Sequence, residues 1–231
     1  MSTEYWLYLI IGLVVFNYLF STVLDFINDR NWRNEIPPEM KDYYDEEKYV
    51  KAKNYAKEKG RISLISSTLS TLITILFLSL QGYGWLDNII SNYYDIPFLQ
   101  SGFFFLTLFI LGEFISIPFS CYNTFVIEEK YGFNKTTVKT FVVDKIKGYL
   151  LTLIIGGGLL AGALYLVTIL SNGFWGWLWI GLAILMLLIN MFYADLIVPI
   201  FNKLTHLDRG SLREKIETYT KKVGYSLKNI Y

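Results

Sequence analysis

Long apolar segments alternate along the chain with segments that carry nearly all of the charge. Five apolar segments are each long enough to cross a hydrocarbon core of about 30 Å as a helix that rises about 1.5 Å per residue. They cover residues 5–27, 62–83, 98–125, 148–170 and 174–198. The pattern therefore predicts an all-α, multi-pass membrane protein with five transmembrane helices.

The polar segments between these spans predict further helices and turns. Residues 28–61 hold nine Lys/Arg and eight Asp/Glu around a break at Pro37-Pro38, and no proline follows between residues 39 and 60. We interpret 39–60 as a solvated amphipathic helix, with a patch that binds lipid headgroups as the alternative. The segment between the second and third spans contains Gly82, Gly84 and Pro97, so we expect a linker there.

A polar stretch at residues 127–137 separates the third and fourth spans. Pro118 removes a helical hydrogen bond and is expected to kink the third span near its end. Gly132 is suited to end this helix in the left-handed conformation. Asn134 or Thr136 is expected to cap the next helix. A helix stop followed by a helix start is therefore predicted here.

The tail, residues 199–231, is polar, and Ser211 is expected to cap a short helix within it. We accordingly divide the chain into a membrane domain, residues 1–198, and the start of a cytoplasmic part, residues 199–231.

Basic residues are distributed unevenly between the two sides of the predicted membrane. Nine Lys/Arg lie between the first and second spans, five between the third and fourth, seven after the fifth, and none elsewhere. The positive-inside rule then places the N-terminus outside and the helical loops and soluble tail in the cytoplasm. The chain is expected in a bacterial inner membrane or the endoplasmic reticulum.

Composition excludes several classes of function. The chain is 53% hydrophobic and only 18% charged, with a net charge of +1, so a nucleic-acid partner is not expected. A single cysteine, Cys121, excludes an internal disulfide. His206 is the only histidine, and we find no two-histidine zinc motif, no cysteine cluster and no Ser-His-Asp set in the sequence. We predict no catalytic residue, metal ligand or cofactor within this chain.

Among the polar side chains inside predicted spans, we single out Glu113 and Asp195, with Asn190 near the latter. Polar groups at membrane depth are costly and face protein or water. A proton or ion path, a water-filled cavity and a hydrogen bond between helices all remain open. These residues motivate an alternative function, in which the chain is a small non-enzymatic membrane protein, either part of a proton-coupled transporter or a binding scaffold.

Several strings together resemble a known family. They are Ile36-Pro37, Pro118-Phe119, Ile-Glu-Glu-Lys-Tyr-Gly-Phe-Asn-Lys-Thr at 127–136, Asp-Lys-Ile-Lys at 144–147 and Pro-Ile-Phe-Asn-Lys-Leu at 199–204. The chain resembles the N-terminal, five-helix membrane region of the type I CAAX prenyl endopeptidases, integral-membrane zinc metalloproteases that trim prenylated C-terminal tails. The resemblance implies nine signature or docking positions: Glu128, Glu129, Gly132, Asn134, Asp144, Lys147, Pro199, Asn202 and Lys203.

The resemblance also implies what this chain lacks. The family's His-Glu-x-x-His zinc motif would lie beyond residue 231, and His206 stands where the family usually has proline. We therefore expect a truncated membrane half that walls an intramembrane chamber and is inactive alone, so that enzyme activity of the chain itself stays uncertain. Its partners would be the lipid bilayer, a missing C-terminal zinc domain and, in the full-length protein, a peptide substrate. A pseudo-protease that binds without cleaving is a further option.

Overall fold

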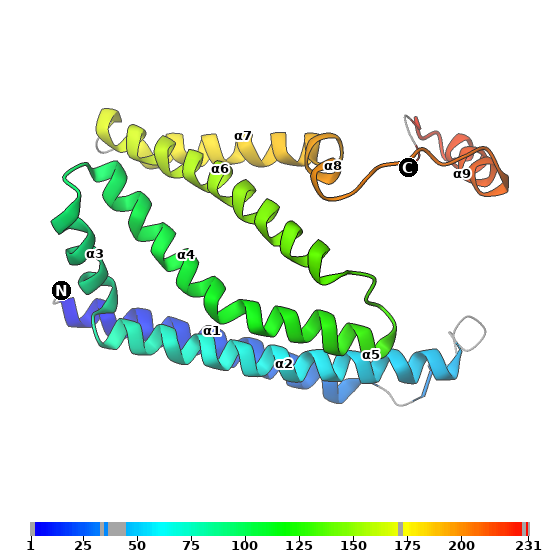
Figure 1. Cartoon of the computed structure of the whole chain (residues 1–231), viewed down its shortest axis with the longest axis horizontal. Coiled ribbons are helices and arrows are strands. Elements are labelled where there is room, and N and C mark those ends of the chain that lie inside the picture. Colours follow the sequence, from blue (N-terminus) through cyan, green and yellow to red (C-terminus); the bar gives the residue numbers. More distant parts are fainter. Residues whose placement is uncertain (1–2, 33–34, 37–44, 171–172, 228–229, 231) are drawn as a thin grey trace. The chain divides into compact units, whose positions relative to one another are not determined.

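The structure, a computed structural model, describes residues 3–32, 35–36, 45–170, 173–227 and 230 (Figure 1). Every regular element in these residues is helical, which confirms the all-α prediction. The predicted break at Pro37-Pro38 lies outside the described residues. The chain forms two compact units, Met1–Thr137 and Val138–Tyr231. This division does not test the predicted boundary at residue 198, which stays a prediction.

Within the residues that the structure describes, five helices are long and apolar enough to cross a membrane, as predicted. They run over Glu4–Asn31, Glu46–Ser79, Pro97–Tyr131, Val138–Leu170 and Phe174–Phe201. Most extend beyond the predicted apolar segments because flanking charged residues continue the helix. None of the described residues of the second span's helix or of the fourth and fifth spans' main helices is buried. Their apolar side chains therefore need lipid or other protein around them.

In the first unit, α1 (Thr3–Asn31) and α2 (Glu46–Ser79) lie side by side (Figure 1). The hydroxyls of Tyr18 and Thr68 hydrogen-bond between them at 2.7 Å. Asp45 caps α2 by accepting from the backbone N–H groups of residues 47 and 48. The predicted cytoplasmic helix and second span are therefore one continuous helix. Gly60 does not interrupt it, because one glycine costs a helix only about 1 kcal/mol.

The predicted linker between the second and third spans is wrong. It is largely a helix, α3 (Gly82–Tyr93), and α2 ends at Ser79 rather than at residue 83. Gln81 reverses the chain with a φ of 56°. Leu86 and Ile90, one turn apart, are buried, and α3 contacts both α2 and α4. Burial of this short stripe outweighs the helix-weakening effect of two glycines.

The third span changes helix type towards its end. Helix α4 (Pro97–Tyr122) contains Pro118 and continues into a π-helix, η2 (Asn123–Glu128), and a single turn, α5 (Glu129–Tyr131). Figure 1 shows that α4 is bent along its length; it approaches α2 at the α5 end and diverges from it towards α3. Gly132 ends the helix with a φ of 74°, which confirms the predicted left-handed stop.

The second unit contains α6 (Val138–Leu170) and α7 (Phe174–Phe192), which pack together. A second π-helix, η4 (Tyr193–Ile197), and the short α8 (Val198–Phe201) follow, and α9 (Ser211–Lys222) lies in the tail. Two predicted caps are wrong. Helix α6 begins at Val138, directly after Thr137 rather than after Asn134 or Thr136. Gly210 occupies the cap position of α9, and no side chain bonds there, so Ser211 is a helical residue.

Candidate functional site

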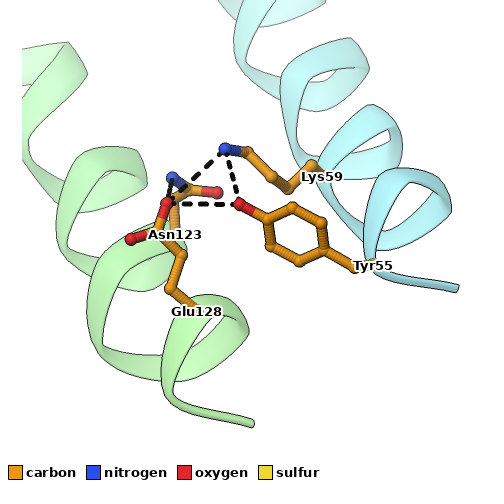
Figure 2. Close-up of polar contacts among 4 residues, drawn as sticks. All are labelled: Tyr55, Lys59, Asn123 and Glu128. Carbon is orange, nitrogen blue, oxygen red and sulfur yellow. Dashed lines mark hydrogen bonds and ion pairs between the residues drawn. The ribbon is translucent and has the colours of Figure 1, made fainter. Parts of the chain in front are cut away.

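Polar side chains gather in the first unit where α2 meets η2 and α5. Figure 2 shows Tyr55 and Lys59 of α2 directed towards Asn123 and Glu128. One carboxylate oxygen, Glu128 Oε1, accepts from the Tyr55 hydroxyl at 3.5 Å, from Lys59 Nζ at 3.5 Å and from Asn123 Nδ2 at 3.3 Å. Lys59 Nζ also donates to the Tyr55 hydroxyl at 3.1 Å. Glu128, singled out by the sequence, thus has its partners within this chain.

A second ion pair joins the same two elements. Lys130 of α5 donates to the carboxylate of Glu58, the residue next to Lys59 on α2. Each segment therefore supplies one acid and one base, and each charge faces the opposite charge of the other segment. We call Glu58, Lys59, Glu128 and Lys130 the crossed ion pairs.

The π-helix brings Asn123 and Glu128 together. Residues five apart on an ordinary α-helix point about 140° away from each other, since each turn holds 3.6 residues. The i→i+5 bonding of a π-helix stacks them instead. The Asn123 amide can then reach Glu128 Oε1, and both side chains face α2. A change of helix type thus aims the acid at its partners.

Aromatic rings surround the crossed ion pairs. The Tyr55 ring lies 5.5 Å from that of Tyr131 and 4.9 Å from that of Phe133, and Lys51 Nζ lies 5.8 Å from the Phe133 ring centre. Tyr131 and Ile127 are buried. Apolar burial therefore accompanies the charge pairing at this junction.

The turn after α5 is held by the neighbouring signature residues. The Glu128 carbonyl accepts from the N–H groups of Phe133 at 2.8 Å and Asn134 at 3.1 Å. Asn134 Nδ2 donates to Glu129 Oε2 at 3.0 Å, and its Oδ1 accepts from the Thr136 N–H at 2.7 Å. Gly132 supplies the positive φ that this reversal requires.

The remaining signature positions meet in the second unit. Lys147 of α6 lies 3.8 Å from Asp144 and donates to the Ile200 carbonyl of α8 at 2.8 Å. Pro199 stands in the first turn of α8, where its missing N–H costs nothing. Asn202 ends α8, and Lys203 is exposed. Lys147, on the helix of the fourth span, therefore binds the end of the fifth span.

The three predicted intramembrane polar residues are divided between the units. Glu113 is half-buried in α4 of the first unit. Asn190 and Asp195 are exposed on α7 and η4 of the second. Asn190 Nδ2 donates to the Met186 carbonyl of its own helix at 2.8 Å, so its amide is partly satisfied without a neighbouring helix.

The residues present do not fit a zinc ion. No group of three or more His, Cys, Asp or Glu side chains able to hold a metal occurs in the part of the chain that the structure describes. The chain has one histidine, His206, which is exposed, and one cysteine, Cys121, which is half-buried in the third span.

Among the residues that pair α2 with η2 and α5, sequence reasoning singled out Glu128 and missed the others. Tyr55, Glu58, Lys59 and Lys130 were not singled out, because their partners across the junction lie 69 to 73 positions away. Asn123 was not singled out, because it reaches Glu128 through the π-helix. One signal was available. An acid followed by a base at residues 58–59 matches an acid and a base at 128 and 130.

Comparison with known proteins gives a consistent picture. Residues 25–203 match the family described as CAAX prenyl protease N-terminal, five membrane helices. The chain is 32% identical to the probable CAAX prenyl protease 1 of Schizosaccharomyces pombe over 86% of its length and 45% of that protein. It is 31% identical to the human CAAX prenyl protease 1 homolog over 93% of its length and 47% of that protein.

A solved structure agrees with these relatives. The crystal structure of Ste24p from S. mikatae superposes with a TM-score of 0.84 at 27% identity. The match covers 97% of this chain and 53% of the other. The chain therefore spans about half the length of the relatives that it matches.

Proposed function

Because the chain belongs to the CAAX prenyl protease family and matches its five-helix N-terminal membrane region, we propose that it walls an intramembrane chamber for a prenylated or membrane-associated peptide. The whole protein would be a CAAX-type zinc metalloendopeptidase. The observation that carries this proposal is the match of the family's five-helix region to residues 25–203.

The arrangement of the first unit supports a wall rather than a tight bundle. Helix α4 meets α2 at one end and diverges from it towards the other, where α3 lies between them (Figure 1). None of the described side chains of α4 is buried. Helices that pack so little against each other need further protein or lipid to cover them.

The zinc-binding residues are proposed to lie outside these 231 residues. A His-Glu-x-x-His motif needs two histidines, and the chain has only His206. The 231-residue segment alone is therefore proposed to be inactive. Its exposed signature residues, Glu129, Asn202 and Lys203, would contribute to docking the zinc-binding part. Glu128, which was expected to dock as well, is instead paired with Lys59 of this chain.

A chimera tests the proposal. Residues 1–231 would replace the matching region of the Schizosaccharomyces pombe relative, and cleavage of a prenylated CAAX peptide would be measured in lipid vesicles. We expect chelator-sensitive cleavage by the chimera and none by the 231-residue chain. The control is the same chimera with the glutamate of the relative's zinc motif changed to glutamine. A folded, membrane-inserted chimera without activity would contradict the proposed function, and chelator-sensitive cleavage by residues 1–231 would contradict their inactivity alone.

The alternative of a proton-coupled transporter part rests on Glu113 in α4 and Asp195 in η4. It expects vesicles that contain the chain to take up protons and to lose this uptake in Glu113→Gln, whether or not zinc is present. The family match favours the protease proposal.

A further inference from the structure

Two oppositely charged pairs cross between the second and third spans at a single level. On α2, Glu58 is directly followed by Lys59. On the other side, Glu128 ends η2 and Lys130 lies in α5. Lys59 pairs with Glu128 at 3.5 Å, and Glu58 pairs with Lys130. The order of charges on one segment therefore complements the order on the other.

These ion pairs are too exposed to contribute much to the free energy of folding. The side chains of Lys59 and Glu128 are 40% and 27% exposed, and those of Lys130 and Glu58 are 58% and 32% exposed. Partly solvated ion pairs contribute little to folding free energy. Like charges brought face to face are unfavourable, however, so such pairs discriminate well between alternative alignments.

Away from the junction where Tyr55 packs against Tyr131 and Phe133, the contact between these spans carries little alignment information. Apolar side chains of a span meet lipid about as well as they meet another apolar span, so sliding of one helix along another costs little. Helix α4 also diverges from α2 away from this junction (Figure 1). The junction of α2 with η2 and α5 is therefore where their relative position can be specified.

A slip of one helical turn would remove both pairs. If α2 moved by four residues in one direction, Asn54 and Tyr55 would take the places of Glu58 and Lys59. In the other direction, Ile62 and Ser63 would take them. A slip of three residues in this second direction would place Arg61 opposite Lys130, a like-charge contact. Each neighbouring alignment therefore loses both ion pairs.

A second acid, Glu129, is held in a hydrogen bond that keeps it from pairing with Lys59. Glu129 follows Glu128 and would be a second partner for Lys59 in a rotated helix. Its Oε2 instead accepts from the Asn134 amide across the Gly132 turn. The π-helix, in turn, directs Glu128 and Asn123 towards α2. Rotation and axial position of the third span are thus both specified.

We propose that the crossed ion pairs set the register of the third span against the second. The π-helix η2 orients Glu128 towards α2, and Asn134 holds the Glu129 carboxylate away from the lysines. This role in setting the register goes beyond the proposed protease function and needs no catalytic activity.

Spin-label distances in the intact 231-residue chain test the register directly. The chain would carry Cys121→Ser with labels at Lys57→Cys and Lys135→Cys, which are exposed positions on α2 and after the Gly132 turn. We expect one narrow distance distribution in lipid vesicles. Lys130→Glu and Glu58→Lys should each broaden it or shift it by about one helical turn, about 5 Å. The double exchange Glu58→Lys with Lys130→Glu should restore the narrow distribution.

Two further variants complete the experiment. Lys130→Gln is a milder change that serves if Lys130→Glu does not fold, and it should also broaden the distance distribution. Arg213→Glu, which breaks the partly exposed Arg213–Glu217 pair of α9, should leave the distance distribution unchanged. An unchanged narrow distribution in the folded single variants would overturn the proposal, and so would a double exchange that remains broad.

Discussion

At the scale of residues, the sequence predicts backbone features better than partners. Gly132 was predicted to be left-handed from its type and place alone, and the structure has it at a φ of 74°. Glu128 was singled out, but its partners Tyr55 and Lys59 lie about seventy positions away and on another helix. Local conformation follows from a residue and its neighbours. A contact between helices follows only from their packing.

Replacing Gly132 by alanine should destabilise the protein. The left-handed conformation costs a residue with a Cβ about 1–2 kcal/mol. Space is not the obstacle, because the nearest atom to an added Cβ is Lys51 Nζ at 3.9 Å. We expect a lower thermal unfolding midpoint in detergent or lipid.

The matched control is Gly148→Ala, in the first half of α6, where nothing lies within 4 Å of an added Cβ. Alanine is the better helix former, so this variant should be equally or more stable. A Gly132→Ala protein as stable as Gly148→Ala would show that the left-handed turn carries no cost.

At the scale of elements, the apolar spans were predicted and the helix type was not. Segments of about twenty apolar residues are recognised directly, since only helices or closed barrels satisfy their backbone in lipid. Helix α3 was taken for a linker because Gly82 and Gly84 suggested a turn, whereas burial of Leu86 and Ile90 decided the outcome. The π-helices η2 and η4 had no sequence signal. Both precede a short helix and a Phe-Asn-Lys string, at residues 133–135 and 201–203.

Helix α9 should show a pH-dependent ion pair. Arg213 Nε donates to Glu217 Oε1 at 2.9 Å, and this hydrogen bond lowers the pKa of Glu217. A lowered pKa means that the pair stabilises the helix above the ordinary glutamate pKa of about 4.3 and that this support is lost as the pH falls through the folded-state value.

Titration of the Glu217 carboxyl carbon by NMR measures this directly. We expect a midpoint below the ordinary glutamate value, and a return towards that value in Arg213→Gln. A Glu217 midpoint that does not respond to Arg213→Gln would contradict the assigned cause.

At the scale of the whole molecule, the fold class and family region were predictable because two signals are read directly from the chain. These are the five apolar segments and the strings at 127–136 and 199–204. The pairing of α2 with η2 was not predicted, because it joins segments that the sequence separates by about seventy residues. The division at residue 198, the docking roles of the signature residues and the orientation in the membrane stay predictions.

The orientation can be measured by labelling from one side. In a Cys121→Ser chain, Lys135→Cys lies in a predicted cytoplasmic loop and Asn92→Cys in a predicted outer segment; both positions are exposed. In sealed vesicles of known sidedness, an impermeant thiol reagent applied to the outer side should label position 92 and should label position 135 only after the membrane is opened. The reverse pattern would show that the basic loops do not set the topology as the positive-inside rule requires.

The length of the short helix α3 affects the width of the first unit. Two residues separate α3 from α2 and three separate it from α4, and its twelve residues measure about 18 Å at 1.5 Å per residue. The length of α3 therefore sets the distance between the C-terminal end of α2 and the N-terminal end of α4. Removing one turn of α3 would shorten that distance by about 5 Å without altering any residue of the spans. Evolution could thus adjust the width at this end of the first unit by adding or deleting residues between two spans, while the crossed ion pairs keep the opposite end unchanged.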